Sequence, residues 1–165
     1  MLEQSSSDRE RLTYAAFGDA ATEIARAVIA SGYQPEVIVA IARGGLPLAG
    51  CLSYLLDVKT VATINVEFYT GVDSRLPHPV MLPPLLDLSD FADRRVLVVD
   101  DVADTGNTLA MVFEMLNPVC AEVRDAVIYH KPQSIRVPNY FWRTTSAWID
   151  FPWSSPEAIA AVGQA

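Results

Sequence analysis

The sequence predicts an α/β fold, in which helices cover both faces of a doubly wound, mostly parallel sheet. Apolar runs of strand length alternate along the chain with segments whose apolar residues recur every three or four positions, as on one face of a helix. The run Val96–Val99 is apolar at every position, which is typical of a parallel strand buried on both faces. Alternating strands and helices form βαβ units, whose right-handed crossovers produce such a sheet.

The first half of the chain predicts a helix, a strand and a second helix. Residues 1–10 are polar and charged, and we expect them to be disordered. Tyr14–Ala30 predicts a helix that ends at Gly32, since glycine commonly follows a helix C-terminus. Glu36–Ala42 is rich in valine and isoleucine and predicts a strand, and Leu46–Leu56 predicts the next helix.

The second half repeats this pattern after an irregular span. Val58–Val66 predicts a weaker strand, and residues 67–93 carry four prolines with little periodicity. Because compact domains rarely leave so long a span unstructured, we expect a flexible loop there, either a closing lid or a hairpin or oligomer contact. The strand that begins at Val96 is followed by a helix at Leu109–Leu116 and a last core strand at Val123–Tyr129.

The C-terminal segment 138–153 is rich in aromatic residues. We expect it to form a small hood over one end of the sheet, and the alternative is that its rings close a small core. The aromatic residues are Tyr140, Phe141, Trp142, Trp148, Phe151 and Trp153.

Length and composition predict one domain that spans residues 1–165. The chain is 51% apolar, enough for a substantial core, yet it lacks the roughly twenty-residue apolar run that a bilayer requires. Its first residues lack the apolar centre of a secretory leader, so we expect a cytoplasmic location, with Cys51 and Cys120 as reduced core residues. A net charge of −8 argues against a nucleic-acid partner.

The segment VLVVDDVADTGNT, residues 96–108, leads an apolar strand into three acids and a polar turn. Ligands of parallel sheets bind beyond the carboxyl ends of the strands. Asp100 and Asp101 stand at such an end, and alternation along the strand predicts that they point to opposite sides of the sheet. Each could accept a hydrogen bond from one hydroxyl of a ribose, with a hydrated Mg²⁺ held nearby through water.

A phosphate site is predicted directly after these acids. Thr105, Gly106, Asn107 and Thr108 precede a helix, whose free amides and partial positive charge suit a phosphate dianion. Gly106 allows the backbone to approach the ligand closely. The alternative is that Asp104 and Thr105 merely cap an ordinary helix. The Asp-Asp-x-x-Asp spacing argues against a haloacid-dehalogenase phosphatase, and the lack of GxxxxGK[ST] and GxGxxG motifs argues against P-loop and dinucleotide enzymes.

Residues 96–108 resemble the ribose-phosphate signature of the type I phosphoribosyltransferases. The resemblance implies that Asp100 and Asp101 hold the ribose hydroxyls of phosphoribosyl pyrophosphate and its Mg²⁺. It also implies that Asp104 lies near the nucleobase as a catalytic proton acceptor, and that residues 104–108 bind the 5′-phosphate. Asn107 departs from the residues that 6-oxopurine members often carry there, which leaves the backbone cradle intact but could weaken phosphate affinity.

Arg43-Gly44-Gly45 follows another apolar strand and begins a helix, where amides and a guanidinium could bind pyrophosphate. The alternative is a surface arginine beside a glycine turn. The family's pyrophosphate loop often contains a cis peptide, and the resemblance implies that the bond between Arg43 and Gly44 is the cis one.

The base site is predicted at the last core strand and in the hood. The Lys131 ammonium is a pure donor, so it would favour a 6-oxo over a 6-amino group. The adjacent His130 is expected to be a packed neighbour. Trp148–Trp153 resembles the base-covering hood of bacterial xanthine-guanine phosphoribosyltransferases, which implies that Trp148 stacks on the purine and the Ile149 carbonyl accepts from its edge. Asp150 is a further candidate for the metal or for pyrophosphate.

The function expected from these residues is transfer of a 5-phosphoribosyl group to hypoxanthine, guanine or xanthine in purine salvage, with Mg²⁺ as cofactor. Two alternatives stay open: a non-catalytic sensor of phosphoribosyl pyrophosphate, and a transferase for another nucleobase. By analogy with relatives, we expect a homodimer or homotetramer.

Overall fold

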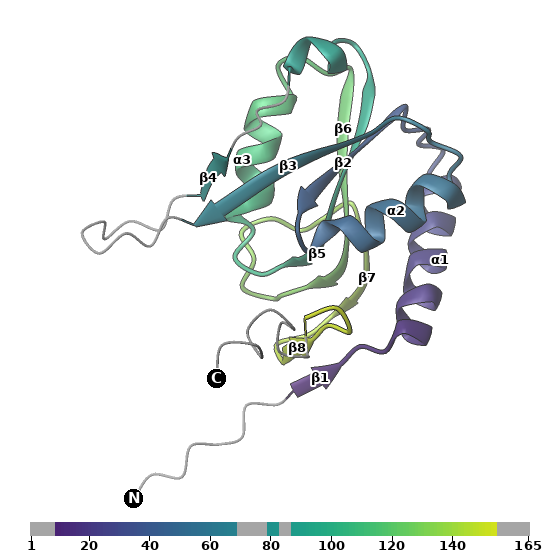
Figure 1. The fold of residues 1–165 in the computed structure, drawn as a ribbon, viewed down its shortest axis with the longest axis vertical. Coiled ribbons are helices and arrows are strands. Elements are labelled where there is room, and N and C mark those ends of the chain that lie inside the picture. Colours follow the sequence, from purple (N-terminus) through teal and green to yellow (C-terminus); the bar gives the residue numbers. More distant parts are fainter. Residues whose placement is uncertain (1–8, 69–78, 83–86, 155–165) are drawn as a thin grey trace, which may run out of the picture.

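The chain folds into a six-stranded sheet with a separate two-stranded sheet at one end (Figure 1). The computed structural model describes residues 9–68, 79–82 and 87–154. The strand order in the main sheet is β4-β3-β2-β5-β6-β7, and all neighbours are parallel except the antiparallel pair β3 and β4. The strands are β2 (Val37–Ala42), β3 (Val61–Phe68), β4 (Pro79–Leu82), β5 (Arg95–Ala103), β6 (Glu122–His130) and β7 (Tyr140–Thr144).

Helices cover both faces of this sheet, which confirms the predicted doubly wound α/β fold. Helices α1 (Tyr14–Ala30) and α2 (Gly45–Leu55) pack on one face, and α3 (Asn107–Leu116) packs on the other (Figure 1). A short 3-10 helix, η1 (Leu88–Phe91), precedes β5. The Thr13 hydroxyl accepts from the Ala16 N–H at 3.1 Å and so caps the start of α1.

The two central strands explain why the sheet needs helices on both sides. Successive side chains of a strand point to opposite faces, and the completely buried run Val96–Val99 contributes to both apolar clusters. Leu97 and Val99 face α1 and α2, whereas Val96 and Val98 face α3. Each such side chain stabilises the fold by about 1.5–3 kcal/mol through burial.

The order of the strands fixes where a ligand can bind. From β2 the chain moves outward to β3, and from β5 it moves in the opposite direction to β6, so the topology reverses between β2 and β5. Connections at the carboxyl ends of these two strands therefore lead in opposite directions, and ligands of such sheets commonly bind at this point. Both predicted anion-binding segments, residues 43–45 and 100–108, lie at this switch point.

The N-terminal region differs from the prediction of a disordered segment 1–10. Arg9–Arg11 form β1, which pairs in parallel with β8 (Trp148–Asp150), while residues 1–8 lie outside the described residues. The Tyr129 hydroxyl donates to the Glu10 carboxylate at 2.9 Å and ties β1 to the main sheet. The sequence of residues 9–11 alone gives no sign of this pairing, because the partner residues 148–150 lie far away in the sequence.

The predicted hood 138–153 also divides into two parts. Tyr140–Thr144 are β7, the edge strand of the main sheet, and only the later residues form the small sheet with β1 (Figure 1). Trp153 packs edge-on against Phe17 of α1, with ring centroids 5.2 Å apart. The aromatic segment thus both closes the core and covers the end of the sheet.

The span 67–93 contains regular structure, in contrast to the predicted flexible loop. Its described parts comprise the end of β3, strand β4 and helix η1. The antiparallel register from Asn65↔Leu82 to Phe68↔Pro79 corresponds to the hairpin alternative. The prediction of a lid falls largely on residues 69–78 and 83–86, which lie outside the described residues.

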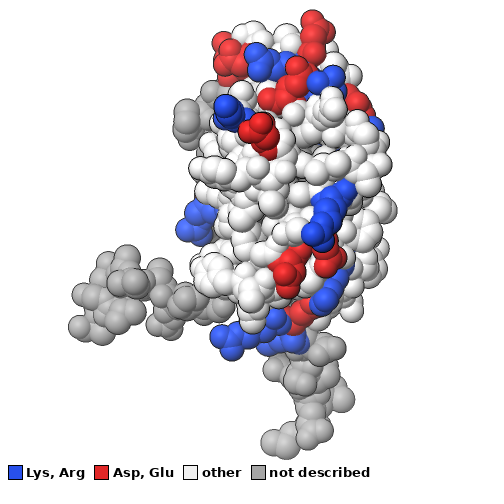
Figure 2. Space-filling model, turned by 90° about the vertical axis from the view of Figure 1, so that its right-hand side faces the viewer, with Lys and Arg blue, Asp and Glu red and all other residues white. Residues whose placement is uncertain are grey.

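The surface lacks a large basic area on the side of α1. Basic and acidic side chains are interspersed there with wide uncharged areas (Figure 2).

Among the described residues, no helix is long and apolar enough to cross a membrane. Cys51 and Cys120 are free, half-buried thiols packed against the two apolar clusters, and burial raises the pKa of each.

Candidate active site

Asp100 and Asp101 lie at the end of β5 and form a half-buried pair of carboxyls. The Asp101 N–H donates to the Asp100 carboxylate at 2.9 Å. Burial, followed by the charge of Asp101, raises the pKa of Asp100 well above its usual range, and burial raises the pKa of Asp101. The two carboxyls are therefore close enough to influence each other electrostatically.

This pair suits a cation. Among the described residues, no lysine or arginine forms an ion pair with Asp100 or Asp101. Two half-buried carboxylates without a positive partner are unfavourable, and carboxylate oxygens are preferred ligands of Mg²⁺, often through bound water. The donor set is thus compatible with a hydrated Mg²⁺ shared with an anionic ligand.

The loop after β2 packs against these acids. A Cβ on Gly45 would lie 2.2 Å from the Val99 carbonyl oxygen, so this position requires glycine. A Cβ on Gly44 would lie 2.3 Å from an Asp101 carboxylate oxygen, so a side chain there would require the Asp101 carboxylate to move. Arg43 is exposed, and its guanidinium forms no ion pair with any described residue. The loop therefore brings a free cation and closely packed backbone to the acids.

The cis peptide bond of this loop joins Ala42 to Arg43. The prediction of a cis bond between Arg43 and Gly44 is therefore wrong by one residue. Strand β2 continues through Ala42, so the loop begins with the bond that precedes Arg43, and the sequence pattern does not distinguish these neighbouring bonds.

The predicted phosphate turn surrounds a cavity of about 400 Å³. Gly106 adopts φ 81°, a left-handed conformation that favours glycine, and stands at the N-cap of α3. The Thr105 hydroxyl accepts from the Asn107 N–H at 3.3 Å, so the capping alternative holds in part. The cavity is lined by residues 100–106 together with Thr108 and Leu109. Four of the five predicted phosphate residues, all but Asn107, thus line one space.

A second, larger cavity of about 840 Å³ lies between the end of β6 and the small sheet. Lys131 is buried, and its ammonium donates to the Ala147 carbonyl in the segment before β8. The other two ammonium protons remain available to a ligand. Lining residues are Arg9, Val102, Asp104, Lys131, Gln133, Ser146, Trp148, Ile149, Asp150, Phe151 and Ser154.

Strand β8 contributes Trp148 and Ile149 to the lining of this cavity. Trp148 is 63% exposed, so it is not one of the rings that close the core, whereas Phe151 is buried. The Leu12 N–H donates to the Asp150 carbonyl at 3.0 Å. Because alternate residues of a parallel strand bond to its neighbour, the Ile149 carbonyl points away from β1.

Asp150 is placed differently from the other acids. The Arg9 guanidinium binds both of its carboxylate oxygens and holds the pKa of Asp150 below its usual range. Asp150 lines the larger cavity, whereas Asp100 and Asp101 line the smaller one. Within the described part of the chain, no three metal-ligating side chains form one cluster. The structure thus does not bring Asp150 together with the other two predicted metal ligands.

Asp104 connects the two cavities. It lines both of them, as does Val102. Its exposed carboxylate accepts a hydrogen bond from the Gln133 side chain at 2.9 Å. A ligand that filled both spaces would therefore pass beside this carboxylate. His130 is buried against Phe141, as a packed neighbour, and its Nε2 has no hydrogen-bond partner among the described residues.

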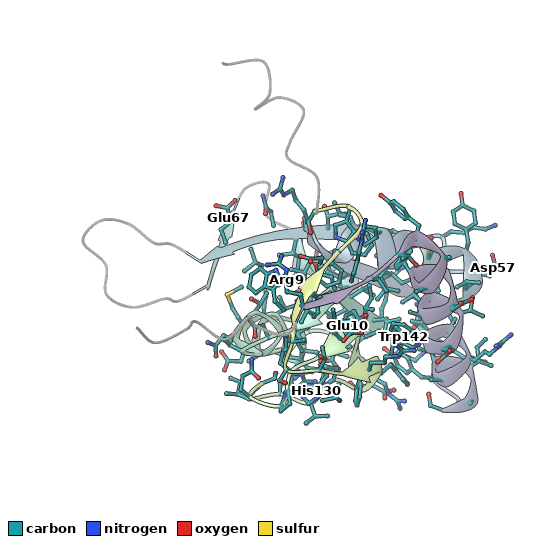
Figure 3. All side chains as sticks on the ribbon, turned by 90° about the horizontal axis from the view of Figure 1, so that it is seen from below. Arg9, Glu10, Asp57, Glu67, His130 and Trp142 are labelled. Atoms are coloured by element: carbon teal, nitrogen blue, oxygen red, sulfur yellow. The ribbon has the colours of Figure 1, made fainter. Side chains whose placement is uncertain are left out.

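Sequence reasoning missed two residues of this site, Arg9 and Gln133. Arg9 lies on β1 beside Glu10, over the end of the main sheet (Figure 3). No sequence signal indicates it, because its role depends on pairing with β8. Gln133 follows the predicted Lys131 by two positions, and this proximity to a strand end is the signal that could have suggested it.

Comparison with known proteins adds independent information. The family profile described as phosphoribosyl transferase domain matches residues 10–159. A xanthine-guanine phosphoribosyltransferase of Nitratidesulfovibrio vulgaris (strain Hildenborough) is 36% identical over 120 residues, which cover 72% of this chain and 68% of that protein. The enzyme of the same name from Cereibacter sphaeroides is 32% identical, with the same coverage.

Solved structures agree with these matches. A purine phosphoribosyltransferase from Pyrococcus horikoshii superimposes with a TM-score of 0.79 at 36% identity, and the alignment covers 92% of this chain and 97% of that one. A Helicobacter pylori xanthine-guanine-hypoxanthine phosphoribosyltransferase gives a TM-score of 0.74 at 25% identity, with 90% and 94% coverage.

Proposed function

Because the chain belongs to the phosphoribosyltransferase family, we propose that it transfers the 5-phosphoribosyl group of phosphoribosyl pyrophosphate to a 6-oxopurine, as in purine salvage. The observation that carries this proposal is the position of Asp104 between two cavities, one built from the phosphate turn and one from Lys131 and β8. Such an arrangement suits a sugar phosphate on one side and a flat base on the other.

The smaller cavity is proposed to hold the sugar phosphate. Free amides at the start of α3 and the hydroxyls of Thr105 and Thr108 would bind the 5′-phosphate. Asp100 and Asp101 would accept from the ribose hydroxyls, and Arg43 with the Gly44 backbone would bind pyrophosphate. Mg²⁺, held by Asp100 and Asp101 through water, would neutralise part of the negative charge of the leaving group.

The larger cavity is proposed to hold the base. Lys131 would donate to the 6-oxo group, and it would meet a 6-amino group donor to donor, which leaves the amine of adenine unpaired. Trp148 would cover the purine face, and the Ile149 carbonyl would accept from a ring N–H. Asp150, held by Arg9, would line the same cavity rather than the ribose side.

The reaction breaks the bond between C1′ of the ribose and a pyrophosphate oxygen and forms a bond from C1′ to a purine nitrogen. The anomeric carbon passes through an oxocarbenium-like state, and the purine itself is the nucleophile. The residues of the chain would therefore align base and sugar, exclude water and accept the purine proton on Asp104.

A pyrophosphate-release assay with a panel of bases tests the proposal. With Mg²⁺ and phosphoribosyl pyrophosphate present, we expect turnover with at least one of hypoxanthine, guanine and xanthine, and none with adenine or uracil. Turnover with adenine or uracil would overturn the oxopurine assignment. Binding of phosphoribosyl pyrophosphate without turnover of any base would instead support the sensor alternative.

A homo-oligomer in the cytoplasm is proposed as the form of the protein. Several large apolar side chains are exposed around α2 and the start of β3, among them Tyr54, which is 91% exposed. Exposed apolar patches commonly mark protein interfaces. The free thiols of Cys51 and Cys120 are compatible with a reducing compartment. Light scattering after gel filtration tests the oligomeric state.

A further inference from the structure

The loop that follows β6, residues 131–139, is fastened to the turn between β5 and α3. The Lys131 N–H donates to the Ala103 carbonyl at 3.0 Å, and the Ile135 N–H donates to the Thr105 carbonyl at 2.9 Å. A Cβ on Gly106 would lie 2.5 Å from the Ser134 hydroxyl, so loop and turn are in close contact. These contacts hold the loop in one place relative to the acids of the turn.

An ion pair between Arg136 and the buried Asp125 also anchors the loop 131–139. The Arg136 guanidinium donates to the Asp125 carboxylate at 2.7 Å, and Asp125 is fully buried. The Asn139 N–H donates to the other Asp125 oxygen at 2.7 Å, so both oxygens are paired. The guanidinium also stacks on the Phe113 ring of α3, 3.4 Å from its centroid. A fully paired buried charge of this kind fixes the path of the chain around it.

Gln133 lies between these fixed points and reaches back to the predicted proton acceptor. Its Nε2 donates to Oδ1 of Asp104 at 2.9 Å, and both side chains line the larger cavity. No hydrogen bond from another described residue reaches Oδ2 of Asp104. An exposed aspartate has several rotamers of similar energy, and a donor on one oxygen selects among them. The second oxygen is then left for a ligand.

We propose that Gln133 is a positioning residue for Asp104, which it holds with Oδ2 directed at the purine nitrogen that loses its proton. This inference rests on the proposed function, because it requires Asp104 to accept that proton. The proton moves from the purine nitrogen to Oδ2, while the electron pair of the N–H bond stays on the ring as C1′ is attached. Gln133 neither gains nor loses a proton.

The first test replaces Gln133 with methionine, which has a similar length and no donor. Gln133 is exposed, so Gln133→Met should fold normally, and thermal unfolding checks this. We expect kcat to fall about tenfold, the effect of losing a hydrogen bond to a charged group, with an unchanged KM for phosphoribosyl pyrophosphate. The exposed Val137 of the same loop provides the control Val137→Thr, whose kcat should equal that of the unmodified protein.

The second test separates positioning of Asp104 from a general effect on the loop. In an Asp104→Asn background, Gln133→Met should cause no further loss of kcat, because the two side chains act as one unit. The loss should also shrink with 8-azaguanine, since a base with a more acidic ring N–H depends less on the proton acceptor. If Gln133 had a purely structural role, Gln133→Met would lower kcat by the same factor in the unmodified protein and in the Asp104→Asn variant. The factor would also be the same with 8-azaguanine as with guanine.

The outcomes distinguish this inference from the proposed function. Equal losses in the two backgrounds, or an unchanged kcat in Gln133→Met, would overturn the role of Gln133 while base-dependent turnover stands. Full activity of Asp104→Asn would overturn the proton-accepting role of Asp104 and the Gln133 inference with it. Absence of turnover in the unmodified protein with every base would reject the proposed transfer itself.

Discussion

The α-carbon of Gly44 packs directly against the carboxylate of Asp101, so the loop after β2 and the acids after β5 share one surface. The two segments are more than fifty residues apart in the sequence, and they meet because the strand order reverses between β2 and β5. If the proposed function is correct, this contact joins the pyrophosphate side of the site to the ribose side.

Substitution of Gly44 by alanine should therefore weaken the binding of phosphoribosyl pyrophosphate, the phosphoribosyl donor. The added methyl group would lie 2.3 Å from an Asp101 carboxylate oxygen and would displace this carboxylate from its position in the site. We expect the KM for phosphoribosyl pyrophosphate to rise about tenfold with a smaller change in the KM for the base. Gly50→Ala on α2 is the matched control, because its methyl group meets open space and should stabilise the helix by about 0.4–1 kcal/mol. An unchanged donor KM in Gly44→Ala would contradict this view of the contact.

The ionised Asp100 carboxylate should lower the free energy of unfolding of the ligand-free protein. Its pKa is raised in the folded state, chiefly by burial, so ionisation is easier in the unfolded chain and stability falls as pH rises through this raised pKa. Asp100→Asn should be more stable than the unmodified protein at pH 7, and the difference should shrink as the pH is lowered toward the ordinary aspartate pKa of about 4. Urea unfolding at a series of pH values measures this.

The same variant should lose activity, because the amide cannot replace the carboxylate as a partner for ribose and Mg²⁺. Mg²⁺ with phosphoribosyl pyrophosphate should stabilise the unmodified protein in a thermal shift and should stabilise Asp100→Asn much less. Lower stability of Asp100→Asn than of the unmodified protein at pH 7 would contradict the destabilising effect of the Asp100 carboxylate.

Loss of Arg136 should destabilise the protein far more than loss of a surface arginine. Arg136→Met would leave the fully buried Asp125 carboxylate without its charge partner, which typically costs about 3–5 kcal/mol. Arg94→Met, at an exposed position, should change the free energy of unfolding by less than about 0.5 kcal/mol. Urea unfolding of both variants at neutral pH makes the comparison, and similar values would rule out an anchoring role for the pair.

Arg9 should affect the base and leave the donor unaffected. Arg9 holds Asp150 from the neighbouring strand, so Arg9→Met would loosen the edge of the larger cavity without contact to the smaller one. We expect the KM for the purine to rise about fivefold, the scale of one exposed ion pair, at an unchanged KM for phosphoribosyl pyrophosphate. Arg26→Met on α1, outside the larger cavity, should change neither constant. A shift in the donor KM alone would argue against this assignment of the cavities.

The central part of the fold could be predicted from the sequence because local signals and tertiary environment agree there. Val96–Val99 is apolar because both of its faces are covered, and the polar turn after it is polar because it borders a cavity. Both features are local, and the predicted helix Tyr14–Ala30 coincides with α1 for the same reason. The apolar pattern that predicts a strand at Val58–Val66 is weaker, and the observed strand β3 is shifted relative to it, from Val61 to Phe68.

The parts that could not be predicted depend on contacts between distant segments. The pairing of Arg9–Arg11 with β8 has no signal in either segment alone. The hydrogen bonds from Arg9 to Asp150 and from Gln133 to Asp104 likewise join segments that are distant in the sequence. The sequence therefore predicts the residues that line the smaller cavity more completely than those that line the larger one.

The pairing of β1 with β8 also bears on the order in which the protein can mature during synthesis. The loop after β2 and the residues that line the smaller cavity, which lie within 43–45 and 100–109, are all made before residues 148–150. The larger cavity is lined by Arg9 together with residues 148–150, so this part of its lining is complete only after residues 148–150 have been made. A chain interrupted before Trp148 would thus contain every residue that lines the smaller cavity but would lack part of the lining of the larger one.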